Sequence, residues 1–189
     1  MIGILAVGNE LRGDDGVGIY AGRLLRDRGF PVVFAHENPE NVIDKLRGFD
    51  RIVVLDAAHF SGNEPFRVVQ PGDSHYSHRP GLSKLAGFLG VPFVVVGIKA
   101  YKRALFRGVS DRAKENARAA VKVVEMCMAL PGVVVDAERK LVDVNGKEKQ
   151  VKFAVPGVKK GDFVLIHAGV VIERLTAEEF EEARKAIIL

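Results

Sequence analysis

Four short, almost entirely apolar runs recur through the first two thirds of the chain, and they constrain its fold more than any other feature. They span residues 2–7, 31–35, 51–55 and 92–97. Runs of this kind are typical of strands that are buried on both faces of a parallel sheet. Helical patterns alternate with them, at residues 17–28, 39–46, 82–89 and 110–125, the last with Ser110 as its expected N-cap. The alternation predicts an α/β fold over residues 1–125, with a doubly wound, mostly parallel sheet that binds ligands at the carboxyl ends of its strands.

The pattern changes after residue 125. Short apolar segments at 130–135, 141–144, 150–154 and 162–172 read as strands separated by turn signals. One of these signals is Asn145-Gly146, and Asn-Gly between two apolar runs strongly indicates a hairpin. Thr176 and Glu179 have the spacing of a capping box, which predicts a helix to the C-terminus. We therefore expect a second domain at residues 126–189, a small OB-like β-barrel with a C-terminal helix.

The loop between the first expected strand and helix, residues 8–18, is rich in glycine and contains two adjacent acids, Asp14 and Asp15. A dinucleotide-binding fold uses this loop to bind pyrophosphate, but the glycine spacing here is not GxGxxG and two carboxylates would repel an anion. Carboxylates instead suit a divalent cation. The structural alternative is that one aspartate caps the helix or lies favourably at its positive end. Two acids are more than capping requires.

Further candidate ligands follow along the chain. Asp56 comes directly after the third apolar run, a position that faces the ligand crevice, although an Asp there also commonly begins a turn or caps a helix. His75 and His78 precede the third expected helix. A single histidine is more often a surface residue than a ligand. Together with Asp15 and Asp56, one imidazole would complete a site for a transition metal.

In this order, the motifs of residues 1–125 resemble the hydrogenase maturation endopeptidases of the HycI/HybD type. The matching segments are residues 8–18, Asn38-Pro39-Glu40-Asn41, Asp56-Ala57, Ser77-His78, Gly97-Ile98-Lys99 and Gly108-Val109-Ser110. Members of that family remove a short C-terminal tail from the large-subunit precursor of [NiFe] hydrogenases after nickel has been inserted. The resemblance implies that Asp15, Asp56 and His78 bind a metal. The implied metal is nickel, which could be the nickel already inserted into the substrate, or another divalent transition metal.

The resemblance also ranks the remaining candidates. His78 is preferred over His75 because the family pattern places a leucine four residues after its histidine, and Leu82 fits. His59 stands where many relatives have an acid, so His59 and His75 are additional candidates. A metal at this site would polarise the scissile carbonyl or activate a water molecule, with Asp14 as a candidate base beside Asp15. The sequence contains neither an HExxH motif nor a GxSxG motif, which argues against a zincin or a serine peptidase.

Two segments of the second part, residues 126–132 and 161–169, resemble the signatures of HypC/HupF-type hydrogenase assembly chaperones. Those chaperones carry an Fe(CN)2(CO) unit with a scaffold partner and deliver it to the large-subunit precursor. The resemblance implies that Cys127 and His167 bind the iron unit or the precursor, and thiolate and imidazole are suitable ligands for iron. Without the resemblance, a lone cysteine is most often a buried apolar residue. Free-standing chaperones have this cysteine at the N-terminus, whereas here a predicted helix precedes Cys127, so no α-amine is available.

Composition sets the limits on function. The net charge of +4 comes from scattered Lys and Arg residues without a long basic block, so we expect no nucleic-acid partner. A single cysteine excludes an intramolecular disulfide, and no apolar run is long enough to span a bilayer, so we expect a soluble cytoplasmic protein without membrane contact. The leading hypothesis is a metal-dependent endopeptidase with a fused chaperone domain that binds the large-subunit precursor or the iron-cofactor scaffold. The alternative is a catalytically inactive docking chaperone for the same precursor.

Overall fold

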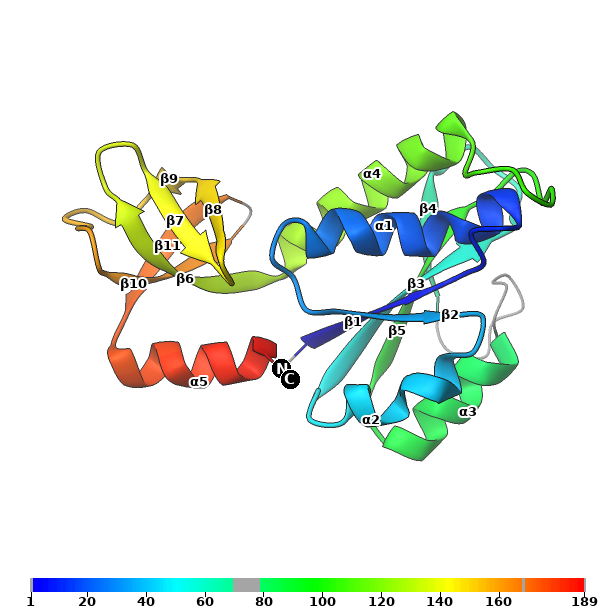
Figure 1. Ribbon diagram of the computed structural model, residues 1–189, viewed down its shortest axis with the longest axis horizontal. Coiled ribbons are helices and arrows are strands. Elements are labelled where there is room, and N and C mark those ends of the chain that lie inside the picture. Colours follow the sequence, from blue (N-terminus) through cyan, green and yellow to red (C-terminus); the bar gives the residue numbers. More distant parts are fainter. Residues whose placement is uncertain (1, 70–78, 168, 189) are drawn as a thin grey trace.

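The computed structural model describes residues 2–69, 79–167 and 169–188 and contains two separate sheets (Figure 1). The first sheet and its helices comprise β1 (Ile2–Val7), α1 (Val17–Arg26), β2 (Val32–His36), α2 (Ile43–Leu46), β3 (Arg51–Ala58), β4 (Phe66–Val69), α3 (Arg79–Leu89), β5 (Phe93–Lys99) and α4 (Asp111–Cys127). Two 3-10 turns, Gly13–Gly16 and Pro39–Val42, precede α1 and α2. The strands and helices alternate as the apolar runs predict.

The first sheet has the strand order β2-β1-β3-β5-β4. Strands β1, β2, β3 and β5 are parallel, and β4 pairs with β5 in the antiparallel direction. Helices α1 and α4 cover one face of the sheet, and α2 and α3 cover the other (Figure 1). The expected α/β fold with a mostly parallel sheet is confirmed. The edge strand β4 was not expected, because its sequence Phe-Arg-Val-Val is short and contains a charged residue.

The second sheet has the strand order β8-β7-β6-β10-β11-β9. Its elements are β6 (Ala129–Asp136), β7 (Leu141–Val144), β8 (Lys147–Gln150), β9 (Lys152–Phe153), β10 (Phe163–His167), β11 (Val170–Leu175) and α5 (Ala177–Ile188). The Asn145-Gly146 hairpin is confirmed, because β7 and β8 are antiparallel and both turn residues have positive φ, 53° and 78°. Thr176 and Glu179 form the expected capping box, in which each backbone N–H donates to the other side chain.

Two expectations for this part differ from the structure. Residues 162–172 do not form one strand, because β10 and β11 pair as an antiparallel hairpin that turns near Gly169, where φ is 78°. The OB-like barrel is not confirmed. Strands β8 and β9 are the two edges of a six-stranded sheet, and no ladder between them closes the sheet in the described part of the chain.

The two parts pack directly against each other. Helix α4 continues past residue 125, where we expected the domain boundary, and ends at Cys127. One hydrophobic core runs from α1 and α4 into the second sheet. The side-chain amide of Asn145 donates to the carbonyl of Gly29 at 2.9 Å, and Lys147 forms an ion pair with Asp27 at 3.6 Å. No helix in the described residues is long and apolar enough to cross a membrane.

Candidate active site

Glycines allow the acidic loop to fold tightly against the carboxyl ends of β1 and β3. At Gly18, in the first turn of α1, an added Cβ would overlap the carbonyl oxygens of Val7 and Leu55. At Gly8, φ is 143° and an added Cβ would overlap the carbonyl oxygen of Asp15. Only glycine permits these approaches. They bring Asp14 and Asp15 close to the carboxyl end of the central strand β3.

Asp14 is a structural anchor. Its buried carboxylate accepts hydrogen bonds from the backbone N–H groups of Tyr101, Lys102 and Ser110 at 3.0, 3.1 and 2.7 Å, and from the Ser110 hydroxyl at 3.0 Å. Burial raises the pKa of the Asp14 carboxyl, but these hydrogen bonds outweigh burial and hold the pKa below its usual value. The carboxylate thereby ties the loop after β1 to the loop between β5 and α4.

The structure does not show the expected capping of α1 by one of the two aspartates. Gly16 is the N-cap of α1, and no side-chain hydrogen bond caps that helix in the described structure. The helix that does receive a side-chain cap is α4, where the Ser110 hydroxyl accepts from the N–H of Ala113 at 3.3 Å, as expected. Asp14 therefore helps to position Ser110, the N-cap residue of α4.

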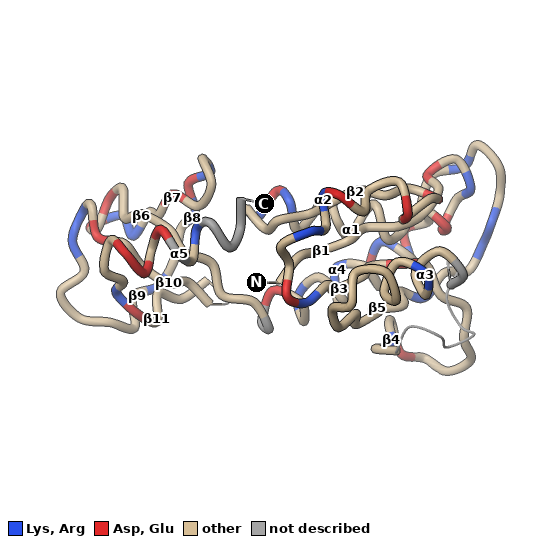
Figure 2. The backbone as a smooth tube through the Cα atoms, turned by 90° about the horizontal axis from the view of Figure 1, so that it is seen from below, with Lys and Arg blue, Asp and Glu red and all other residues tan. Residues whose placement is uncertain are grey.

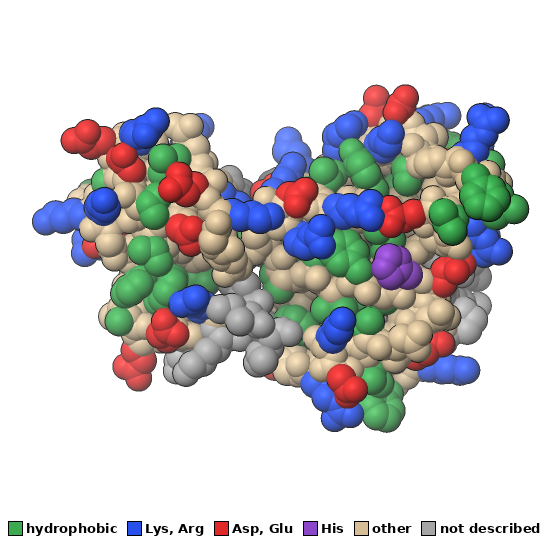
Figure 3. Space-filling view, in the orientation of Figure 1, with side chains coloured by type: hydrophobic (Ala, Val, Ile, Leu, Met, Phe, Trp, Pro, Cys, Tyr) green, Lys and Arg blue, Asp and Glu red, His purple; other side chains and the backbone are tan. Residues whose placement is uncertain are grey.

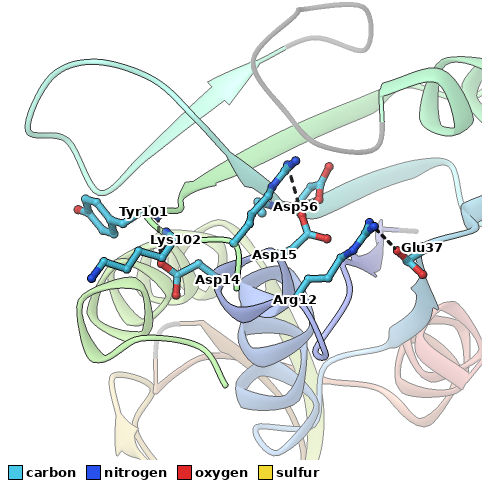
Figure 4. Close-up of polar contacts among 9 residues, drawn as sticks. Arg12, Asp14, Asp15, Glu37, Asp56, Tyr101 and Lys102 are labelled. Atoms are coloured by element: carbon cyan, nitrogen blue, oxygen red, sulfur yellow. Dashed lines mark hydrogen bonds and ion pairs between the residues drawn. The ribbon is translucent and has the colours of Figure 1, made fainter. Parts of the chain in front are cut away.

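Asp15 and Asp56 are both buried, and we call these two residues the acid pair. In Figure 4 the side chains of Asp15, from the loop after β1, and Asp56, from β3, point into the same region, while Asp14 points away toward Tyr101 and Lys102. Asp15 is 3% exposed and Asp56 is fully buried. Asp56 accepts a hydrogen bond from the N–H of Ala57 at 2.8 Å. Two adjacent buried carboxylates repel each other, so a nearby positive charge stabilises the pair.

Arg103 provides such a charge. Its guanidinium lies 3.4 Å from the Asp15 carboxylate, and its side chain is about half exposed. Arg103 was not among the site residues expected from the sequence. The sequence did contain one indication of its role. Lys102 and Arg103 follow shortly after the carboxyl end of β5, and Asp15 and Asp56 lie at the same edge of the sheet. A second arginine of this edge, Arg12, pairs with Glu37 at 3.3 Å (Figure 4).

Two buried carboxylates suit a divalent metal, since carboxylate oxygens are ligands for both hard and transition-metal cations. Within the described residues, no three His, Cys, Asp or Glu side chains form a metal-binding group. The expected third ligand, His78, and the additional candidate His75 lie outside the described residues. His59 directly follows β3, and its side chain is exposed. The structure therefore brings two of the three expected ligands together.

Cys127 and His167 lie in adjoining segments of the second part. Cys127 is the last residue of α4, and β6 begins two residues later at Ala129. The antiparallel ladder of β6 and β10 places His167 directly opposite Ala129. The Cα atoms of Cys127 and His167 are therefore at most about 13 Å apart, since paired Cα atoms are about 5.5 Å apart and each residue adds at most 3.8 Å.

The two candidate sites are far apart. Ser110 contacts Asp14 at the first turn of α4, and Cys127 ends the same helix. A helix of 17 residues is about 25 Å long at 1.5 Å per residue. Helix α4 runs from the first sheet to the second (Figure 1), so Ser110 and Cys127 lie at opposite ends of it.

The fold around the acid pair is that of the hydrogenase maturation proteases. The chain is similar to the [NiFe] hydrogenase maturation protease HybD from Thermococcus kodakarensis, with 27% identity, 66% of this chain and 96% of that chain covered, and a TM-score of 0.58. It is also similar to the maturation protease HycI from Thermococcus kodakarensis KOD1, with 26% identity, coverages of 65% and 88%, and a TM-score of 0.54. An uncharacterized protein from Wolinella succinogenes is 32% identical, with coverages of 65% and 92% and a TM-score of 0.51.

Residues 126–187 match the HupF/HypC family. The chain thus joins a part with the maturation-protease fold to a HupF/HypC-family domain, as both sequence resemblances predicted. A search of the curated proteins finds no significant match.

Proposed function

We propose that this protein is a [NiFe]-hydrogenase maturation factor whose first part removes the C-terminal tail of the large-subunit precursor. The observation that carries the proposal is the buried pair Asp15 and Asp56 at the carboxyl ends of β1 and β3, in a fold shared with hydrogenase maturation proteases. The HupF/HypC domain supports a role in the same maturation process.

In this proposal Asp15, Asp56 and His78 hold a divalent metal, and nickel carried by the precursor is the substrate that they recognise. A metal bound here would supply Lewis acidity toward the scissile carbonyl or a water molecule. Asp14 keeps the acidic loop in place, because all four of its hydrogen bonds run to the loop and N-cap before α4. We therefore assign Asp14 to positioning and no longer to the role of base, since those contacts occupy its carboxylate.

The second part holds the precursor or the iron-cofactor scaffold through Cys127 and His167, with transient binding of the Fe(CN)2(CO) unit. Helix α4, about 25 Å long, separates Cys127 from Ser110, which contacts Asp14 beside Asp15. One precursor would therefore contact the two regions with different parts of its surface. Holding the precursor at the second part raises its local concentration at the first, which favours cleavage without any new contact.

The peptidase proposal is tested by incubating the protein with nickel-loaded and nickel-free precursor and separating the products by mass. We expect loss of the tail only from the nickel-loaded precursor. Asp15→Asn and Asp56→Asn should reduce the rate at least 100-fold while keeping the thermal midpoint. Cleavage at an unchanged rate in both variants would refute the site assignment. Precursor binding without cleavage by the parent protein would favour the inactive docking chaperone.

The role of the second part is tested with Cys127→Ser and His167→Ala. We expect each substitution to weaken binding of the precursor or of the scaffold partner at least 10-fold, with unchanged secondary structure by circular dichroism. Iron binding is then measured by anaerobic reconstitution and elemental analysis of the complex. Binding of both partners at parental affinity by Cys127→Ser would leave the cysteine without a functional role.

A further inference from the structure

Seven exposed or half-exposed residues, which we call the docking patch, border the acid pair at the carboxyl edge of the first sheet. Three are apolar: Leu11, Leu105 and Phe106 are 60%, 68% and 85% exposed. Four are basic: Arg12, Lys102, Arg103 and Arg107. Figure 3 shows apolar side chains gathered at this end of the molecule and bordered by Lys and Arg, and Figure 2 shows basic residues at the same end.

Backbone contacts join the two loops that form the patch. The N–H of Phe106 donates to the carbonyl of Leu11 at 2.7 Å, and Arg12 forms a parallel β-bridge with Arg107. The N–H of Asp14 donates to the carbonyl of Lys102 at 2.9 Å. A surface that is ordered in advance loses little conformational entropy when a partner binds.

The backbone of Phe106 is unusual within this patch. Its φ of 56° lies in the left-handed region, which is unfavourable for a bulky residue. Phe106 is 85% exposed, so burial within the chain does not compensate for the backbone conformation. Backbone strain of this kind is concentrated at functional sites, and clustered exposed apolar residues mark surfaces that bind a partner.

The charges of the patch indicate the chemistry of the partner. A cavity of about 280 Å³ is lined by Arg12, Arg103, Ala104 and Leu105. Arg103 also contacts Asp15 at 3.4 Å, so the cavity adjoins the acid pair. Two guanidinium groups beside an apolar wall suit a carboxylate on a peptide that also carries apolar side chains.

Few accessible acids oppose this charge. Arg12 pairs with Glu37, but both side chains remain about half exposed and accessible to a partner. Glu10 of the same loop is bound by two nitrogens of Arg23. The Asp14 and Asp15 carboxylates are buried. The exposed face is therefore predominantly positive and complementary to an acidic segment.

We propose that the docking patch binds the C-terminal extension of the large-subunit precursor as an extended peptide, with an apolar side chain on Phe106 and Leu105 and a carboxylate on Arg12 and Arg103. This proposal rests on the proposed function and adds the surface that positions the tail. Because Arg103 contacts both the patch and Asp15, a tail bound here passes directly beside the acid pair.

The test compares the affinity of the full chain for nickel-free precursor with its tail and for the tail-free large subunit, by biolayer interferometry. We expect Phe106→Ser to weaken binding of the tail-bearing precursor at least 10-fold, Phe106→Leu to restore most of it, and binding of the tail-free subunit to stay unchanged. The matched control is Phe88→Ser. Phe88 is 66% exposed in α3, near the opposite end of β5, and its substitution should change neither affinity.

Unchanged affinity of Phe106→Ser for the tail-bearing precursor overturns the proposal. Equal weakening toward the tail-free subunit also overturns it, because the patch would then contact the body of the precursor. If the parent binds the tail through Phe106 but never cleaves it, the proposed function fails and the docking surface stands. If the parent cleaves the tail and Phe106→Ser cleaves it with an unchanged KM, the docking surface fails and the proposed function stands.

Discussion

The hydroxyl of Ser110 donates to the Asp14 carboxylate at 3.0 Å, and the same oxygen accepts the N–H of Ala113 to cap α4. Residues 96 positions apart in the chain are thus joined at the edge of the candidate active site. The contact links the acidic loop to a helix that extends from the first sheet to the second. It explains how one buried aspartate stabilises two loops and a helix N-terminus.

Asp14→Asn should lower the free energy of unfolding by about 2–4 kcal/mol at pH 7, because the amide cannot accept all four hydrogen bonds and its NH2 group would face buried donors. The folded-state pKa of Asp14 is lowered, so its contribution is present above the pKa of the unfolded chain. It is lost as the pH falls through the lowered folded-state value. Below about pH 4, the difference in the free energy of unfolding between Asp14→Asn and the parent should therefore become smaller.

Urea titrations from pH 3 to 7 measure this dependence. Asp44→Asn is the control, because Asp44 is exposed and pairs with Arg47, three residues further along the chain. Its unfolding midpoint should match that of the parent at pH 7. A constant difference between Asp14→Asn and the parent over the whole pH range would contradict the assigned hydrogen bonds.

Asp15→Asn and Asp56→Asn should each weaken the binding of Ni²⁺ to the full chain at least 10-fold. Removing one of two paired carboxylates takes away both a ligand and half of the negative charge that attracts the cation. Isothermal titration calorimetry at pH 7 measures the affinity. Asp111→Asn, at an exposed position at the start of α4, is the control and should leave nickel binding unchanged. Equal affinity in all four proteins would place the metal elsewhere.

Gly18→Ala should destabilise the fold by about 3 kcal/mol or more, because the methyl group would overlap the backbone carbonyls of Val7 and Leu55. Moving α1 to relieve the overlap would also displace Asp15. Gly87→Ala is the matched control, since Gly87 lies in α3 and a methyl group there would meet no atom within 4 Å. It should stabilise the protein by about 0.5–1 kcal/mol. Similar thermal midpoints for the two variants would contradict the close packing at Gly18.

Thermal unfolding of the whole chain should show one cooperative transition by differential scanning calorimetry, because a continuous core connects the two sheets. Asn145→Gly should lower the midpoint of that transition. Glycine retains the positive φ of the hairpin, but the hydrogen bond to the Gly29 carbonyl is lost, at a cost of about 1 kcal/mol. Two resolved transitions in the parent would show that the two parts unfold independently.

Much of the first part could be predicted because its strands are buried runs and its candidate ligands lie near strand ends. The rule that carboxyl ends of parallel strands meet at one edge predicted that Asp15 and Asp56 would be close together. The anchoring role of Asp14 could not be predicted, because its partners are backbone N–H groups nearly 90 residues away. Backbone donors leave no pattern in the side-chain sequence.

The missed features share a similar cause. Strand β4 contains Arg67, which packs over Phe60 and pairs with Glu64, so a charged residue interrupts the apolar run. The β10–β11 hairpin has apolar residues on both sides of its turn and lacks the Asn-Gly signal that marks the β7–β8 hairpin. In both cases tertiary contacts decide the local structure, and a single sequence does not encode them in its periodicity.

The most direct test of the central claim is the intact mass of nickel-loaded large-subunit precursor before and after incubation with this protein. We expect the mass to fall by that of the C-terminal extension with the parent chain, and to stay constant over the same time with Asp56→Asn. An unchanged precursor mass with the parent chain, or an equal loss with Asp56→Asn, would contradict the assignment of the buried aspartate pair as the cleavage site.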